Sequence, residues 1–502
     1  MSVSISNIFS MSNGQAADVR DATAMSRGDF CESVIEAVRQ GLRISALFGQ
    51  KVEGNRVRLF AVLSHDAESS LLLFHTDIDD GRYESLTPRC TQAHWFEREI
   101  FEQLAVMPCG HPWLKPIRFS ASARGTAEAP EIGVADFFRV EGEEVHEVAV
   151  GPVHAGIIEP GHFRFQCHGE NVFHLEISLG YQHRGIERRL AGGPDRRTVH
   201  YMETLAGDTT IGHSLAYSEL VEALGGTPAP AKAQVLRGIA LELERIANHT
   251  GDLGALAGDV GYLPTLSYCG RIRGDALNMT ALICGNRFGR GLVRPGGTGF
   301  DVEGQRRDEL LRRLDTLEED LRVAVDLLWN SSSVMARFEG TGAISKEECA
   351  AMGLVGPATR ACGIERDIRC DMPHGIFQLG QIPVSTCRTG DVFARAYVRW
   401  LEIQRSITFV REQLKGLPGG AERISVRPLE PDRIAVSLVE GWRGEICHVA
   451  LTGPEGKFTA YKVVDPSFHN WFGLARALRG QQISDFPLCN KSFNLSYCGH
   501  DL

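Results

Sequence analysis

Thiol chemistry is the first possibility that the residue types raise, because the chain contains 13 cysteines. No two of them are spaced as C-x-x-C, the spacing that presents a pair of ligands to one metal ion. Cys489, Cys498 and His500 lie near one another in the sequence and could form part of a zinc site, but a closed site needs four ligands. We therefore expect most of the cysteines to be buried, inert apolar side chains.

Two glycine-rich segments raise the possibility of phosphate binding, residues 285–291 (GNRFGRG) and 295–299 (PGGTG). Each follows a predicted helix, whereas the phosphate-binding turns of P-loop and Rossmann proteins follow a strand. The chain also has no set of four closely spaced cysteines that would hold an iron–sulfur cluster. We expect neither a nucleotide site nor a cofactor bound by this chain itself.

The elements that would position chemical groups are predicted to form an α+β protein of 502 residues. Residues 1–30 read as a flexible leader, and 31–120 as a small α/β domain with helices over 32–42 and 94–104 and strands over 56–64 and 70–75. Residues 121–147 are rich in small residues and are predicted to be a linker.

Residues 148–502 are predicted to form a large, mainly helical domain with small β-sheets. Strands are expected at 162–167 and 172–177, and a β-rich segment at 423–466. Apolar periodicity predicts five long helices, over 197–224, 231–257, 268–288, 305–329 and 390–414.

Composition excludes several classes of partner. The formal net charge of −10 does not favour nucleic acid or an anionic membrane surface. No run of about 18 apolar residues occurs, so we expect no transmembrane helix. The segment from Met1 to Phe30 has no apolar core of the kind that a secretory signal needs. Any link to a membrane is therefore expected to go through a partner.

Two motifs in the first domain, WFERE at 95–99 and GHPWLKPIRF at 110–119, resemble the 30-kDa subunit of respiratory complex I. Seven further motifs follow in order along the second domain: GPVH at 151–154, EPGHFR at 159–164, GYQHRGIE at 180–187, ELERIANHTGDLG at 242–254, NRFGRGLVRPGG at 286–297, EGWRGE at 440–445 and DPSFHNW at 465–471. These resemble both the 49-kDa subunit of complex I and the large subunit of the membrane-bound (group 4, formate-hydrogenlyase type) nickel–iron hydrogenases. Fusion of the two units in one chain is typical of the formate-hydrogenlyase branch, and it also occurs in some complex I systems.

The resemblance implies four positions where hydrogenases carry the thiolates of a nickel–iron centre. In this chain those positions hold Ala206, Thr209, Ser496 and Gly499. Low-valent nickel and iron need soft thiolate ligands, which methyl and hydroxyl groups do not replace. We therefore predict no metal site, as in the energy-converting hydrogenase-related group, which keeps the scaffold without the metal thiolates.

In complex I the quinone headgroup is held between a histidine and a tyrosine. The resemblance places the histidine at His162, with His154 as the alternative, and the tyrosine at Gly207, which has no hydroxyl. Quinone is therefore the one small molecule that remains a candidate ligand, and of the two residues that hold it in complex I only the histidine is retained.

The resemblance also places ionisable residues around the active cavity. Glu187, with His183 and Arg184 beside it, is a candidate for proton relay, because burial raises the pKa of a carboxyl group toward neutrality. Asp208 and His213 complete the candidate set. Each of these residues has an alternative role in an inter-helix hydrogen bond or salt bridge.

The sequence thus predicts a subunit of a membrane-associated oxidoreductase related to complex I and formate hydrogenlyase, with redox-linked proton or ion translocation and no nickel–iron centre. The resemblance implies an iron–sulfur small subunit and membrane antiporter-like and anchor subunits as partners, at the cytoplasmic side of the inner (plasma) membrane. The alternative is a catalytically silent subunit that couples its partners structurally. An active hydrogenase is the third reading, and it requires nickel in the purified protein.

Overall fold

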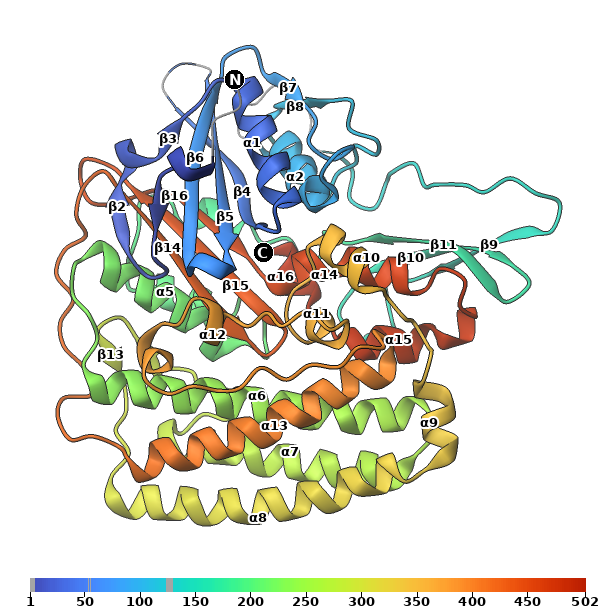
Figure 1. The fold of residues 1–502 in the computed structure, drawn as a ribbon, viewed down its shortest axis with the longest axis vertical. Coiled ribbons are helices and arrows are strands. Elements are labelled where there is room, and N and C mark those ends of the chain that lie inside the picture. Colours follow the sequence, from blue (N-terminus) through green and yellow to red (C-terminus); the bar gives the residue numbers. More distant parts are fainter. Residues whose placement is uncertain (1–4, 53, 55, 123–129) are drawn as a thin grey trace.

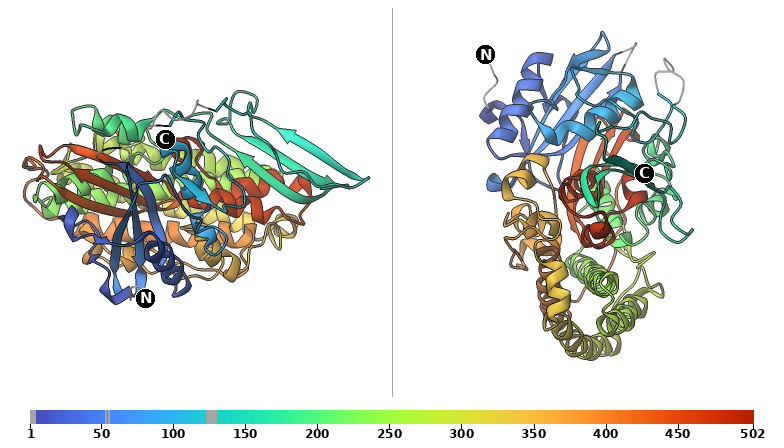
Figure 2. Two further views of the ribbon diagram at one scale, coloured as in Figure 1. Left: turned by 90° about the horizontal axis from the view of Figure 1, so that it is seen from above. Right: turned by 90° about the vertical axis from the view of Figure 1, so that its right-hand side faces the viewer.

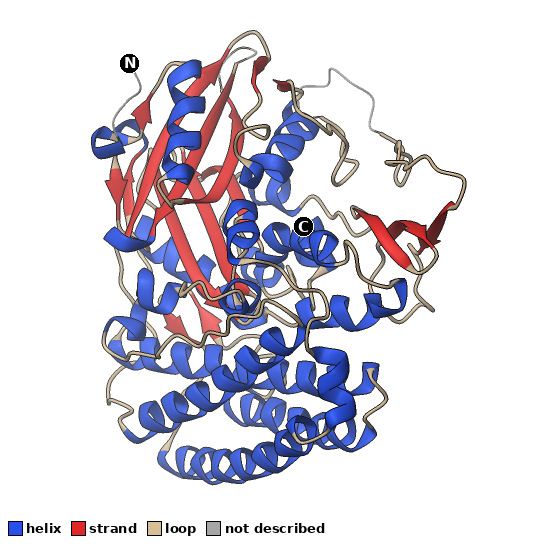
Figure 3. Cartoon of the chain, turned by 45° about the vertical axis from the view of Figure 1, so that its right-hand side comes forward, coloured by secondary structure: helices blue, strands red, loops and turns tan. Residues whose placement is uncertain are grey.

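The computed structural model describes residues 5–52, 54, 56–122 and 130–502. Strands gather in the upper half of the molecule and long helices in the lower half (Figure 1, Figure 3). The structure is α+β, with an N-terminal unit and a larger helical C-terminal unit, as the sequence predicts. No helix among the described residues is long and apolar enough to cross a membrane.

The N-terminal unit is a sheet with two helices. Strands β1 (Ser10–Met11), β6 (Ser70–Ile78), β5 (Val57–His65) and β4 (Arg43–Lys51) are neighbours in this order, and β3 (Thr23–Ala24) pairs with β6 in parallel. Strands β4 to β6 consist largely of buried Val, Leu, Ile and Phe, residues that fit a pleated, buried surface. Helices α1 (Arg27–Arg39) and α2 (His94–Leu104) pack against this sheet.

The prediction of a flexible leader is corrected for residues 10–24. These residues form β1, β3 and β2 (Ala16–Asp18), and β2 pairs with the C-terminal strand β14. The three strands are two or three residues long and, apart from Met11, contain small or polar side chains, so they have no alternating pattern that predicts a strand. Tertiary pairing with β6 and β14 orders them.

The C-terminal unit is built on four long helices that lie side by side (Figure 1). They are α6 (Ala231–Asp259), α7 (Leu263–Cys284), α8 (Gly304–Trp329) and α13 (Val392–Lys415). The helix predicted over 197–224 is instead two helices, α4 (Thr198–Met202) and α5 (Thr210–Leu224). The break at 203–209 contains Gly207, Asp208 and Thr209, residue types with weak helix propensity.

A second sheet lies between the N-terminal unit and the helices (Figure 1, Figure 2). Its order is β16 (Phe458–Val464), β15 (Gly444–Thr452), β14 (Arg433–Gly441) and β2, and all pairings are antiparallel. Helix α5 packs on β14 and β15.

A third sheet of β9 (Val145–Val150), β10 (His162–His168) and β11 (Asn171–Ser178) projects to one side (Figure 1). Strand β9 begins inside the predicted linker, of which residues 123–129 lie outside the described part of the chain. Shorter elements complete the fold: β7 (Arg82–Glu84), β8 (Met107–Cys109), α3 (Ile186–Leu190), β12 (Val293–Arg294), β13 (Gly297–Thr298), α9 (Ser332–Phe338), α10 (Lys346–Met352), α11 (Pro357–Ala361), α12 (Ile368–Asp371), α14 (Pro466–Ala477), α15 (Phe486–Phe493) and α16 (Tyr497–Asp501).

The two units share one hydrophobic core, which runs from the strands of the N-terminal sheet to β14, β15 and α14. Buried ion pairs also cross the junction. Arg43 on β4 pairs with Glu445 on β15, and both side chains are at most 2% exposed. Glu99 on α2 accepts hydrogen bonds from Lys462 on β16 at 2.6 Å. The N-terminal unit is therefore fastened to the sheet of the C-terminal unit rather than tethered loosely to it.

Candidate functional site

Three segments far apart in the sequence converge next to helix α5: the loop 203–209, the C-terminal segment 494–502 and the β9–β10 loop 151–161. The Arg184 guanidinium joins the first two, because it donates to the carbonyl oxygens of Leu205 at 2.9 Å and Cys498 at 3.1 Å. Glu159 of the third segment accepts from the Cys498 N–H at 3.3 Å. The four positions where hydrogenases carry thiolates therefore lie on two segments that meet.

Arg443, in the turn between β14 and β15, fastens the same two segments from inside the protein. Its guanidinium donates to both carboxylate oxygens of Asp208, at 2.6 and 2.8 Å, and to the carbonyl oxygen of Asn494. The guanidinium also lies over the Trp442 ring, 3.9 Å from its centroid. Burial would raise the pKa of Asp208, but the charge and hydrogen bonds of Arg443 outweigh burial and hold this pKa below its ordinary value.

The replaced positions do not fit a nickel–iron centre. Ala206, Thr209 and Ser496 are buried, and none of them offers a thiolate. Cys498 is the thiol nearest in sequence to these positions, and burial raises its pKa to about 11, so it is a neutral thiol at pH 7. One neutral thiol does not supply the soft anionic donors that such a centre requires.

Gly499 shows how the place of one thiolate is filled. A Cβ atom at Gly499 would lie 2.7 Å from the carboxylate of Asp465, which is closer than real contacts allow. Asp465 precedes helix α14 and accepts a hydrogen bond from the Ser467 N–H at 2.8 Å, as an N-cap residue does. A carboxylate therefore occupies the space next to this ligand position.

His213 lies on α5 one turn beyond the loop 203–209, and both of its ring nitrogens have partners. Nε2 lies 3.0 Å from Oδ2 of Asp465, and Nδ1 lies 3.1 Å from Nε2 of His448 on β15. His448 in turn contacts the hydroxyl of Tyr461 on β16 at 2.8 Å. All four side chains are buried.

Glu187 and His183 lie on the side of the site that faces the N-terminal unit. Glu187 accepts from the Val463 N–H at 3.0 Å and pairs with Lys462 at 2.9 Å. His183 Nδ1 lies 2.8 Å from the carbonyl oxygen of Asp501. Both residues line a cavity of about 260 Å³ between the two units, together with Lys462 and Leu502. The predicted set therefore divides: Arg184, Asp208 and His213 surround the replaced ligand positions, and Glu187 and His183 belong to the junction.

The two histidines predicted as a quinone-site remnant make hydrogen bonds within their own hairpin. His154 Nε2 lies 2.8 Å from the carbonyl oxygen of Gly161. His162 Nδ1 lies 3.2 Å from the carbonyl oxygen of Gly151, and its Nε2 accepts from Arg164 at 3.3 Å. Burial lowers the pKa of His162, so its ring is neutral at pH 7. At Gly207, the position of the missing tyrosine, a Cβ atom would meet no atom of the described chain within 4 Å.

Residue types alone do not single out Arg443, Asp465, His448 and Tyr461 as site residues. Arg443 and Asp465 lie inside two of the recognised motifs. The motifs therefore marked these positions, but they did not indicate what the two side chains do. His448 and Tyr461 read as ordinary residues of β-strands. Only the pairing of β15 with β16, which sets His448 opposite Val463, brings them beside α5.

A buried ionic network supports the turn that carries Arg443. Arg245 on α6 donates to the carbonyl oxygens of Glu440 at 2.6 Å and Gly441 at 3.0 Å, immediately before Trp442. Three arginines and four carboxylates make up the network, and each is at most 3% exposed: Glu242, Arg245, Arg360, Asp367, Arg369, Glu402 and Glu440. Because breaking one such pair strands a buried charge, this network gives the Arg443 turn a rigid base.

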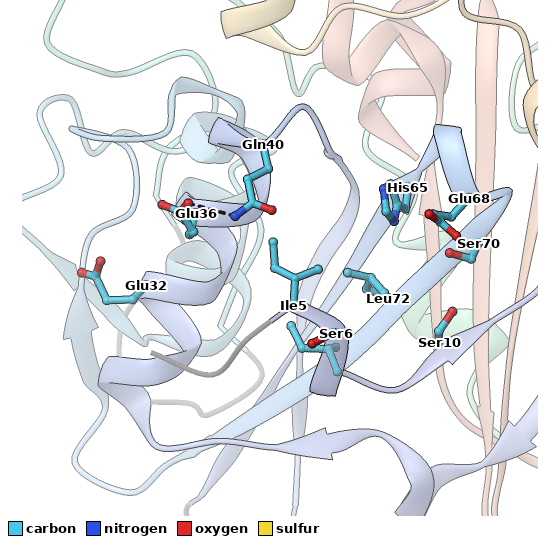
Figure 4. A pocket seen from close by; sticks show the side chains of 11 residues that line it. Ile5, Ser6, Ser10, Glu32, Glu36, Gln40, His65, Glu68, Ser70 and Leu72 are labelled. Atoms are coloured by element: carbon cyan, nitrogen blue, oxygen red, sulfur yellow. Dashed lines mark hydrogen bonds between the residues drawn. The ribbon is translucent and has the colours of Figure 1, made fainter. Parts of the chain in front are cut away.

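A separate cavity of about 880 Å³ lies in the N-terminal unit (Figure 4). Glu32 and Glu36 on α1 form one side, His65, Glu68 and Ser70 form the other, and apolar side chains lie between them. None of the predicted site residues lines it. This cavity is therefore not part of the convergence next to α5.

Comparisons with known proteins agree with the fold. Residues 26–126 match the family "Respiratory-chain NADH dehydrogenase, 30 Kd subunit", and residues 259–431 match "Respiratory-chain NADH dehydrogenase, 49 Kd subunit". The chain is 28% identical to formate hydrogenlyase subunit 5 of Escherichia coli (strain K12) over 481 residues, which cover 91% of this chain and 84% of that protein. It is 30% identical to the carbon monoxide-induced hydrogenase of Rhodospirillum rubrum over 350 residues, which cover 70% of this chain and 97% of that protein.

A solved structure shows the same fold. The archaeal membrane-bound sulfane sulfur reductase contains a chain that superposes with a TM-score of 0.67 at 21% identity, and the match covers 72% of this chain and 99% of that one. The fold and these matches define the class of protein: a 30-kDa-type unit is joined to a 49-kDa-type unit in one chain. The chain belongs to the family of complex I and membrane-bound hydrogenase large subunits, in the fused form that formate hydrogenlyase also has.

Proposed function

We propose that this chain is the central peripheral subunit of a membrane-associated oxidoreductase that couples redox chemistry to proton or ion translocation without a nickel–iron centre. The observation that carries the proposal is the Arg443 guanidinium, which pairs with Asp208 and donates to the carbonyl oxygen of Asn494, so it joins the two segments on which hydrogenases hold the metal. The relatives are named as subunits of hydrogenase or hydrogenlyase systems, which supports a redox assembly as the setting.

An iron–sulfur small subunit is the proposed electron donor or acceptor, since the described residues of this chain contain no group of three His, Cys, Asp or Glu side chains that could hold a metal. Antiporter-like and anchor subunits would link the chain to the cytoplasmic face of the membrane. Quinone is the candidate small molecule, and the open space at Gly207 is where its headgroup would enter.

Purification of the whole assembly through a tag on this chain tests the proposal. We expect iron and acid-labile sulfide to copurify, nickel to stay at background by elemental analysis, and hydrogen uptake with methyl viologen to be absent. Stoichiometric nickel, or hydrogen uptake that follows this chain through the purification, would contradict the proposal.

A silent coupling role is the second candidate, and it is favoured by the hydrogen bonds that engage both nitrogens of His162 within the hairpin. Asp208→Asn separates the two candidates if the assembly stays intact on size exclusion. Loss of electron transfer in this variant supports a redox-coupled site, whereas unchanged electron transfer supports a structural subunit.

A further inference from the structure

Four buried side chains form an unbroken row of hydrogen bonds across the C-terminal unit. Asp465 Oδ2 and His213 Nε2 are 3.0 Å apart, His213 Nδ1 and His448 Nε2 are 3.1 Å apart, and His448 Nδ1 and the Tyr461 hydroxyl are 2.8 Å apart. Exposure is at most 5% for each side chain. The row links Asp465, at the start of α14, with α5, β15 and β16.

With His213 neutral, the Asp465 carboxylate sets the direction of every hydrogen bond in this row. Burial would raise the pKa of Asp465, but its hydrogen bond with His213 and the neighbouring positive charges outweigh burial, so the group is an acceptor-only carboxylate. Neutral His213 then donates from Nε2 and accepts at Nδ1. Burial lowers the pKa of His448 well below its ordinary value, so this ring is neutral, donates from Nε2 and accepts the Tyr461 O–H at Nδ1.

The inner end of the row lies at the replaced ligand positions. The Asp465 carboxylate lies against Gly499, which holds the place of one thiolate. It also contributes to the electrostatic environment of Arg443. A proton that reaches Asp465 therefore arrives beside the Arg443–Asp208 pair.

Beyond Tyr461, a second tyrosine lies on α5. Tyr217 lies four residues after His213, on the same face of the helix, and belongs to the same buried cluster as Tyr461. Tyr217 lies close to Thr198, whose hydroxyl counteracts the effect of burial on the pKa of Tyr217. The Thr198 hydroxyl is also 3.3 Å from Oδ1 of Asp195, whose carboxylate is exposed to solvent.

We propose that the hydrogen-bonded row of Tyr461, His448, His213 and Asp465 carries protons to the replaced ligand positions. Tyr217, Thr198 and Asp195 are the proposed supply of these protons from solvent. In one passage the Tyr461 O–H gives its proton to His448 Nδ1, His448 Nε2–H gives one to His213 Nδ1, and His213 Nε2–H gives one to Asp465. Tyr461 regains a proton from the Tyr217 side, so one proton enters and one leaves and no electron moves. The path rests on the proposed function in one respect, that redox chemistry in the assembly consumes the proton.

Two variants of the intact assembly interrupt the path while conserving shape. Tyr461→Phe removes one hydroxyl. His448→Gln keeps a donor and an acceptor, but a carboxamide does not pass a proton from one atom to the other. The matched control is His469→Gln on α14, a buried histidine outside the row whose pKa burial lowers to about 3.

The measurement is proton uptake, followed with a pH dye, after the assembly is reduced by photoreduced methyl viologen. We expect uptake to slow by about 10²-fold in Tyr461→Phe and His448→Gln, because general acid–base groups contribute factors of this size. Cluster reduction by EPR and the His469→Gln control should stay at wild-type rates, and a small weak acid should restore uptake in Asp195→Asn.

A second measurement does not depend on turnover. Nitrogen-15 spectra of histidine-labelled assembly should show His213 and His448 neutral and protonated at Nε2, assigned by loss of each signal in its glutamine variant. Protonation at Nδ1, or wild-type uptake in both path variants, refutes the path alone. Absence of any redox-linked uptake in the wild-type assembly refutes both the path and the proposed function.

Discussion

Arg443→Met tests whether the guanidinium fastens the loop 203–209 to the C-terminal segment. Methionine fills a similar volume but leaves the Asp208 carboxylate and the Asn494 carbonyl oxygen without their donor. Removing one partner of a buried ion pair costs about 3–5 kcal/mol. Because 34% of the Asp208 side chain is exposed, water partly solvates the abandoned carboxylate, and we place the loss at about 2–3 kcal/mol.

Hydrogen exchange by mass spectrometry on the intact assembly measures this loss locally. A loss of that size lowers the protection of amides in peptides 209–213 and 496–500 by about 30- to 150-fold, since each 1.4 kcal/mol is tenfold. The control is Arg433→Met, which removes only a half-exposed pair with Glu430 and should cost no more than about 1 kcal/mol.

A double-mutant cycle with Asp208→Asn isolates the pair. If the two groups stabilise the loops through each other, the double variant loses about 1–2 kcal/mol less than the sum of the single variants. Wild-type protection of both peptides in Arg443→Met would refute the reasoning, as would strict additivity in the cycle.

Three further outcomes are expected. Gly499→Ala should cost about 1–3 kcal/mol by denaturant unfolding, because its Cβ would meet the Asp465 carboxylate, while Gly207→Ala, with open space, should be nearly neutral; equal effects would contradict the packing. Burial raises the pKa of Glu440 from 4.5 to about 7, so the folded protein keeps a proton that the unfolded chain gives up. The free energy of unfolding should therefore fall by up to about 3 kcal/mol as the pH rises from about 4.5 to about 7, and Glu440→Gln should flatten this slope. Arg43→Met should weaken the junction by about 3–5 kcal/mol and expose it to limited proteolysis, whereas an unchanged cleavage pattern would show that the shared apolar core suffices.

Sequence patterns predicted the long helices well, because each has an apolar face that recurs every three to four residues. The helix predicted over 231–257 is found over Ala231–Asp259. The helix predicted over 197–224 failed at 203–209, where apolar residues continue but Gly207, Asp208 and Thr209 form a loop. That loop depends on partners such as Arg443, which no local pattern reveals.

The candidate site, like the fold, was predicted only in part. The resemblance to the family indicated Arg184, Asp208 and His213, and the structure gathers these residues around the replaced ligand positions. Their partners lie more than 200 positions later in the chain: Arg443 is 235 positions beyond Asp208, and Asp465 is 252 beyond His213. The residues of the leader, which interact with both sheets, were missed because strands of two or three residues have too few positions for a pattern.

The pairing of β2 with β14 has a consequence for biosynthesis. Asn13, just before β2, exchanges hydrogen bonds with Leu438 across a separation of 425 residues. A ribosome that adds about 5–20 residues per second needs roughly 20–80 s to make Leu438 after Asn13 has been made. During that time β2 has no β14 with which to pair, and Arg43 has no Glu445 with which to form an ion pair. We therefore expect nascent chains of this fused protein to bind chaperones until the last sheet has left the ribosome.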